Sequence, residues 1–174
     1  MERLEPLIER PLADLDDTRA LARALAVHLD RGDVVALGGA LGTGKTAFAR
    51  FLIEALSVRA GVPVPGEVPS PTYTLVQVYD AGPLTVWHFD LYRLDRPEDA
   101  LELAIEEAFN DAVSLIEWPE RLGPYLPGDR LEIGFTRTID GTRKAHIRGC
   151  GPRGLGLAAA LGETVDPPAQ PGAV

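Results

Sequence analysis

Eight consecutive residues carry the pattern that most restricts the chemistry of this chain. Residues 39–46 read Gly-Ala-Leu-Gly-Thr-Gly-Lys-Thr, a complete Gly-x-x-x-x-Gly-Lys-[Ser/Thr] phosphate loop. Glycines let backbone N–H groups close around phosphate oxygens, and a helix that follows presents its positive end to the same anion. We therefore expect a nucleoside triphosphate to bind here, with Lys45 on its outer phosphates and the Thr46 hydroxyl on Mg²⁺. The predicted phosphate-binding residues are Leu41, Gly42, Thr43, Gly44, Lys45 and Thr46.

A phosphate loop needs a carboxylate on a neighbouring strand to order magnesium and its waters. Two residues qualify, Asp90 and Glu117, because each directly follows an apolar, strand-like run. Both are expected at the carboxyl edge of the sheet, where open α/β sheets bind ligands. Spacing alone does not rank one above the other.

Other polar residues near these strands allow two interpretations each. The segment Ser70-Pro-Thr-Tyr-Thr74 has four hydroxyls in five residues, and it suits either contact with the γ-phosphate or a polar strand entry. Arg93 could neutralise transition-state charge or form a local ion pair. His88 lies inside an apolar run and is interpreted mainly as a satisfied core histidine. Trp118 is interpreted mainly as a core residue, with stacking near the site as the alternative.

The elements that must position these residues follow from apolar periodicity and from turn signals. Strand, glycine loop and helix succeed one another at residues 33–38, 39–44 and 45–56, which is the arrangement a phosphate loop requires. The pattern predicts an α/β fold of the P-loop NTPase-like, three-layer type, with a mixed, mostly parallel central sheet. Further strands are expected at 4–12 (an edge), 73–79, 84–89, 112–116, 130–137 and 143–148, and further helices at about 16–29 and 97–109. The helix at 16–29 is expected to be capped by Asp14 or Asp16 and to bury Leu21, Leu25, Val27 and Leu29.

Composition bounds the domain organisation and the cellular setting. A chain of 174 residues suits one P-loop domain, expected at 1–150, and the Gly-, Ala- and Pro-rich residues 151–174 suggest a flexible tail. A net charge of −9 argues against a protein that grips nucleic acid by itself. Because Cys150 is the only cysteine and no long apolar run occurs, we expect a cytoplasmic protein without membrane association.

Four motifs in order resemble the TsaE family, the bacterial ATPase of tRNA threonylcarbamoyladenosine synthesis. They are the phosphate loop, Ser70-Pro-Thr-Tyr-Thr-Leu-Val76, His88-Phe-Asp-Leu-Tyr-Arg-Leu94 and Leu115-Ile-Glu-Trp-Pro119, within a resemblance that spans about 12–148. The resemblance implies that Thr46 and Glu117 hold Mg²⁺, that 70–74 is a switch-like loop, and that Asp90 serves turnover by positioning water or by switching. It also implies an adenine pocket near residues 15–18 and 140–141. Lys45, Asp90 and Glu117 are thus the expected catalytic residues.

The resemblance further implies a Mg²⁺-dependent ATPase that is slow alone and is stimulated by two partners, the TsaB and TsaD subunits. The adenosine to be modified lies next to the anticodon, and tRNA would be contacted only through the partners. Two alternatives on the same loop remain open, a small-molecule kinase and a binding module gated by ATP. A GTPase is disfavoured because the Asn-Lys-x-Asp guanine signature is absent.

Overall fold

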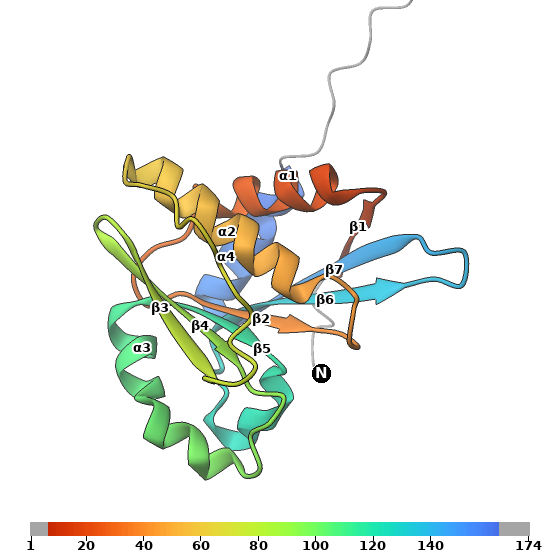
Figure 1. The fold of residues 1–174 in the computed structure, drawn as a ribbon. Coiled ribbons are helices and arrows are strands. Elements are labelled where there is room, and N and C mark those ends of the chain that lie inside the picture. Colours follow the sequence, from red (N-terminus) through yellow and green to blue (C-terminus); the bar gives the residue numbers. More distant parts are fainter. Residues whose placement is uncertain (1–6, 164–174) are drawn as a thin grey trace, which may run out of the picture.

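The computed structural model describes residues 7–163, which form a seven-stranded sheet with helices on both faces (Figure 1). Within this range no helix has both the length and the apolarity needed to cross a membrane. The strands are β1 (Ile8–Leu12), β2 (Val34–Gly38), β3 (Val76–Ala81), β4 (Leu84–Asp90), β5 (Val113–Glu117), β6 (Arg130–Arg137) and β7 (Arg143–Cys150). The α-helices are α1 (Leu15–Ala26), α2 (Lys45–Ala60), α3 (Ile105–Asp111) and α4 (Gly151–Glu163), and two 3₁₀ segments are η1 (Pro97–Leu103) and η2 (Pro119–Tyr125).

The strand order is β1-β7-β6-β2-β5-β4-β3, and the pairing is evenly mixed. Strand β2 runs parallel to β5 and β6, and β4 runs parallel to β5, whereas the other three neighbouring pairs are antiparallel. The mixed sheet is confirmed, but the expected parallel majority is wrong. Both hairpins, β3–β4 and β6–β7, turn too tightly for a parallel crossover. The carboxyl ends of β2, β4 and β5 nevertheless meet at one edge.

Side-chain alternation divides the interior into two apolar clusters, one on each face of the sheet. Leu37 and Leu115 face the layer that contains α1, α2 and α4, which Figure 1 shows together on one side. Val34 and Ile116 face the opposite layer, which contains α3 and η1. Because β2 and β5 are covered on both faces, their short runs are almost wholly buried.

Helix α1 begins and ends at identifiable residues. The Asp14 carboxylate accepts a hydrogen bond from the backbone N–H of Asp17 at 3.0 Å, so Asp14 is the N-cap. Leu21 and Leu25 are buried as predicted, and Leu29 is buried in the connection to β2. The predicted burial of Val27 is wrong, since this residue is the C-cap and 59% of it is exposed.

One predicted helix is divided in the structure, and one predicted strand begins later than expected. The predicted helix at 97–109 is split into η1 and α3 by Ala104, whose φ of 56° is left-handed. The strand predicted at 73–79 begins only at Val76, after a left-handed Leu75 at φ 65°. The backbone N–H of Asp90 donates to the Leu75 carbonyl at 3.0 Å, so this bend is tied to the end of β4.

The flexible tail predicted from residue 151 is wrong for residues 151–163, which form helix α4; residues 164–174 lie outside the described part of the chain. Gly154 permits close packing, because a Cβ there would collide with the backbone of Arg130. Leu157 and Leu161 are buried in the same cluster as α1 and α2. A Gly- and Ala-rich composition is typical of flexible segments, but here the small residues allow the helix to pack closely against the sheet.

A bidentate ion pair joins α4 to the start of β2. Arg153 Nε and Nη2 lie 2.8 and 2.7 Å from the two carboxylate oxygens of Asp33, which is 5% exposed. We expect Arg153→Ala to destabilise the protein by about 1–3 kcal/mol, because it leaves a buried carboxylate without its charged partner and with only the backbone N–H of Asp30 as a donor. Thermal unfolding should show a Tm lowered by about 2–4 °C per kcal/mol. Arg121→Ala, which removes an exposed guanidinium, is the matched control; equal Tm values for the two variants would contradict this role of the pair.

Candidate active site

The phosphate loop connects β2 to α2, as the sequence predicted. Gly44, at φ 114°, is the N-cap of α2, so a residue without Cβ stands where the first helical N–H groups are exposed. Gly39, at φ 128°, lies so close to the backbone oxygen of Phe135 on β6 that any Cβ would collide with it. The loop is therefore fitted against the neighbouring strand, and its amides are free to meet an anion.

Lys45 is held inside this loop. Its ammonium donates to the carbonyl oxygens of Gly39 and of Ala40, the latter at 3.0 Å, and only 5% of the residue is exposed. The Trp118 ring lies 4.0 Å from the same nitrogen. Burial lowers the pKa of Lys45 below its usual value, while the nearby carboxylates, Glu117 first, oppose that shift.

Glu117 ends β5 and receives hydrogen bonds on both carboxylate oxygens. The Thr46 hydroxyl donates to Oε1 at 2.8 Å, and His88 Nε2 lies 2.8 Å from Oε2. Glu117 is 2% exposed and His88 is fully buried. The Thr46 hydroxyl, having used its proton, keeps its oxygen lone pairs for a cation.

Asp90 ends β4 directly beside Glu117, since the two residues are paired in register between parallel strands. Its Oδ2 accepts hydrogen bonds from the hydroxyls of Ser70 at 3.2 Å and Thr72 at 3.0 Å. Its Oδ1 accepts from the backbone N–H of Tyr92 at 3.2 Å. Asp90 thus links the end of β4 to the hydroxyl-rich segment 70–74, which supports the interpretation of that segment as more than a strand entry.

A cleft of about 380 Å³ brings most of the predicted site residues together. Leu41, which is 70% exposed, forms part of its rim, whereas Thr43 is buried and donates to the Ala40 carbonyl at 2.7 Å, so it shapes the loop. Leu15 and Arg143 also border the cleft, near the two segments proposed for the adenine. The lining residues are Leu15, Leu41, Gly42, Gly44, Lys45, Thr46, Ala47, Ser70, Thr72, Asp90, Glu117, Trp118 and Arg143.

Three side chains have contacts that the sequence did not specify. Trp118 fits both interpretations, because it packs partly against the core and also lines the cleft above Lys45, in a left-handed backbone at φ 59°. Arg93 lies with its guanidinium 4.5 Å from the Tyr73 ring, an arrangement that neither earlier interpretation included. His88 is the buried, hydrogen-bonded histidine that its apolar strand predicts, and its partner is the site carboxylate Glu117. The alternation of β4 carried a signal for this, because residues 88 and 90 point to the same face.

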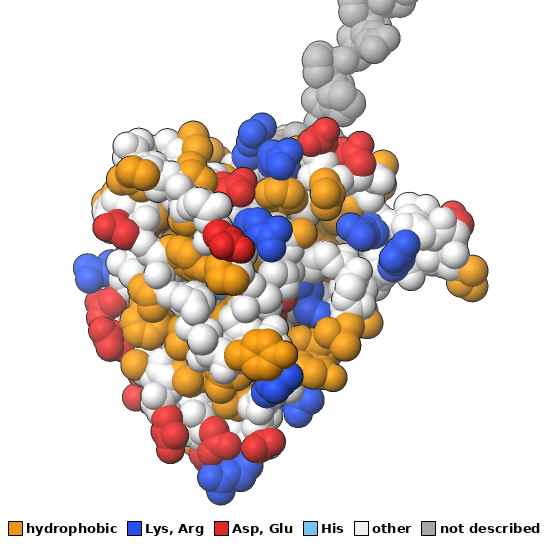
Figure 2. Space-filling view, viewed as in Figure 1, with side chains coloured by type: hydrophobic (Ala, Val, Ile, Leu, Met, Phe, Trp, Pro, Cys, Tyr) orange, Lys and Arg blue, Asp and Glu red, His pale blue; other side chains and the backbone are white. Residues whose placement is uncertain are grey.

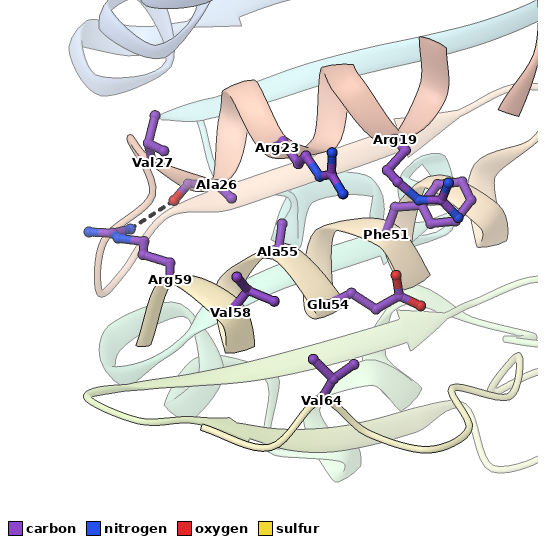
Figure 3. A pocket seen from close by; sticks show the side chains of 10 residues that line it. All are labelled: Arg19, Arg23, Ala26, Val27, Phe51, Glu54, Ala55, Val58, Arg59 and Val64. Carbon is purple, nitrogen blue, oxygen red and sulfur yellow. Dashed lines mark hydrogen bonds between the residues drawn. The ribbon is translucent and has the colours of Figure 1, made fainter. Parts of the chain in front are cut away.

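A second, larger groove of about 460 Å³ shares no lining residue with this cleft (Figure 3). It runs between α1 and α2, with Ala55 and Val58 along its floor and Val64 opposite. Arg19 and Arg23 point toward it from α1, and Arg59 donates to the Ala26 carbonyl at 2.8 Å at its end. Because no phosphate-loop residue lines it, this groove is not the candidate active site.

The oxygen ligands at the cleft suit a hard cation such as Mg²⁺. This ion is bound in many sites by one or two protein oxygens together with phosphates and waters, rather than by a dedicated cage of side chains. Among residues 7–163, no group of three or more His, Cys, Asp or Glu side chains could enclose a metal ion. The hydroxyl of Thr46 and the carboxylate of Glu117, 2.8 Å apart at the cleft, are oxygen donors of the kind that Mg²⁺ prefers.

These features define a class: an α/β protein with a mixed sheet and a phosphate loop between its central strand and the next helix. The family model for the threonylcarbamoyl adenosine biosynthesis protein TsaE matches residues 12–145. The chain belongs to the TsaE family.

Individual relatives agree with this assignment. The tRNA threonylcarbamoyladenosine biosynthesis protein TsaE of Rickettsia conorii is 40% identical over 135 residues, which cover 76% of this chain and 73% of that protein. The protein of the same name from Bacillus subtilis is 33% identical over 139 residues, 79% of this chain and 83% of that one. A crystal structure of Bacillus subtilis YdiB is similar with a TM-score of 0.76 at 28% identity, covering 93% of this chain and 98% of that chain.

Proposed function

We propose that this protein is the ATP-hydrolysing subunit for threonylcarbamoyladenosine modification of tRNA, and that it acts in the cytoplasm with TsaB and TsaD partners. The relatives carry the name of that biosynthesis, and the family model spans most of the chain. The observation that carries the ATPase part is the contact of Thr46 with Glu117, beside Asp90, at the mouth of the phosphate loop.

Each site residue has a proposed role. Residues 41–46 bind the phosphates through backbone amides, and the Lys45 ammonium leaves the loop carbonyls for the outer phosphates. Thr46 and Glu117 hold Mg²⁺, which when bound neutralises charge that develops on the phosphates. Asp90 orients the attacking water, and the hydroxyls of Ser70 and Thr72, now on its Oδ2, are released to the γ-phosphate.

The surface charge of this chain bears on which subunit binds the tRNA. The chain carries a net charge of −9, and on the face shown in Figure 2 basic side chains are spread among acidic ones instead of forming one continuous basic area. Binding to a phosphate backbone requires clustered positive charge. We therefore propose that the partners, rather than this subunit, hold the tRNA.

The deciding experiment measures ATP hydrolysis by the protein alone and with the purified TsaB and TsaD subunits, with modified tRNA as a second readout. We expect slow hydrolysis alone, a clear increase with both partners, and modification only in the complete mixture. Hydrolysis that did not rise with the partners would contradict the proposal. Transfer of the γ-phosphate to a metabolite, detected in a substrate screen, would indicate the kinase alternative.

A further inference from the structure

One buried polar side chain next to the cleft is left unexplained by the proposed roles, the imidazole of His88. It lies on β4 at 0% exposure, two residues before Asp90 and on the same face of the sheet. Its Nε2 is 2.8 Å from Glu117 Oε2, on the strand beside it. A histidine in this position could contact no phosphate, because the carboxylate stands between it and the loop.

The hydrogen-bond pattern defines which nitrogen carries the proton. Ionised Glu117 only accepts hydrogen bonds, so Nε2 must donate. The other ring nitrogen, Nδ1, is buried and has no hydrogen-bond partner in the structure as described. A buried N–H without an acceptor is costly, so the geometry places the donating N–H at Nε2, facing Glu117.

The two donors act on opposite oxygens of one carboxylate. Thr46 fixes Oε1 from the phosphate loop, and His88 fixes Oε2 from β4, so rotation of the Glu117 carboxylate would break one bond or the other. A carboxylate has about four lone-pair sites, and two therefore remain for a cation. Groups that hydrogen-bond a metal ligand orient it before the metal arrives, and their loss typically weakens metal affinity or activity by about 10–100-fold.

We propose that His88 is a positioning residue that holds Glu117 in the orientation required for Mg²⁺. This inference rests on the proposed function, because it assigns the second support of the proposed magnesium ligand. In this role, His88 does not contact the nucleotide directly. Its loss should therefore leave binding of metal-free nucleotide unchanged and should weaken the part of binding that depends on Mg²⁺.

Three substitutions separate positioning from packing. Leucine removes the donor while keeping an apolar side chain of similar size. The glutamine amide nitrogen can reach the position of the histidine Nε2, whereas the shorter asparagine reaches only that of Nδ1. Ser114→Ala is the matched control. This buried serine has no hydrogen-bond partner for its hydroxyl in the structure. Its side chain lies on the face of β5 opposite to that of Glu117.

Calorimetry with a non-hydrolysable ATP analogue, with and without Mg²⁺, provides the readout. We expect His88→Leu and His88→Asn to weaken Mg²⁺-dependent binding by about 10–100-fold, with His88→Gln and Ser114→Ala within about threefold of wild type. All variants should bind the metal-free analogue like wild type. If His88→Leu does not fold, the comparison of Gln with Asn still decides.

The outcomes are separable. Equal Mg²⁺ dependence in His88→Gln and His88→Asn, in a wild type that does respond to Mg²⁺, would overturn the role of His88 and leave the proposed function standing. A wild type whose analogue binding ignores Mg²⁺ would overturn both. Weakening of the metal-free complex by His88→Asn to the same degree would show a packing role and would likewise overturn the inference.

Discussion

Replacing Lys45 by alanine should weaken ATP binding by about 10- to 100-fold, the equivalent of the roughly 1.5–3 kcal/mol of a charge-assisted hydrogen bond. The ammonium is already desolvated and aimed into the loop, where it bonds the carbonyls of Gly39 and Ala40. Exchanging these neutral acceptors for phosphate oxygens gains charge complementarity at little cost in side-chain ordering. Titration calorimetry on the purified variant measures the loss directly.

The chain offers a natural control for this experiment, because Lys144 is its only other lysine. Lys144 lies on β7, where its ammonium is 3.7 Å from Glu9, and it does not line the cleft. Lys144→Ala should therefore bind ATP like wild type. An unchanged affinity in the Lys45→Ala protein would mean that the loop is not the nucleotide site.

The second large effect is expected at Asp90. Asp90→Ala should bind ATP within about threefold of wild type yet lose turnover by about 10²-fold or more, because the attacking water is no longer held in position. The carboxylate lies beside Glu117 but is bonded to Ser70, Thr72 and the Tyr92 amide, not to the phosphate loop. Steady-state phosphate release in the presence of the partners, together with a separate binding titration, distinguishes the two effects.

Asp95→Ala is the matched control for that variant, since Asp95 is an exposed carboxylate five residues along the same connection. Asp95→Ala should leave both ATP binding and turnover intact.

Measuring tRNA modification also tests the binding-module alternative. An Asp90→Ala protein that cannot hydrolyse ATP but still supports full modification would show that bound ATP, without hydrolysis, is sufficient for tRNA modification. Loss of modification would exclude that alternative.

Much of the site could be predicted because its central part is local in sequence. The loop at 39–46 is contiguous, and its conformation depends on glycines at fixed positions before a helix. Asp90 and Glu117 could be nominated because parallel strands end at a common edge. Spacing could not show that they are register neighbours, or that only Glu117 contacts Thr46.

The errors have a common physical origin in contacts between distant segments. The tail predicted from residue 151 is a helix up to Glu163, because the Asp33 carboxylate and the backbone of Arg130 provide partners that composition does not reveal. The sheet is less parallel than expected because, in addition to the two hairpins, the distant strands β1 and β7 pair antiparallel.

The amino-acid sequence by itself determined that this protein has a phosphate loop, two candidate carboxylates and the motifs of one family. Those features depend on residue type and on short spacing, which secondary structure translates directly into geometry. Only the tertiary structure decided that Trp118 covers Lys45 and that His88 supports Glu117. Such contacts arise between strands and loops far apart in the chain, where the packing of the whole sheet, and no local rule, sets which side chains meet.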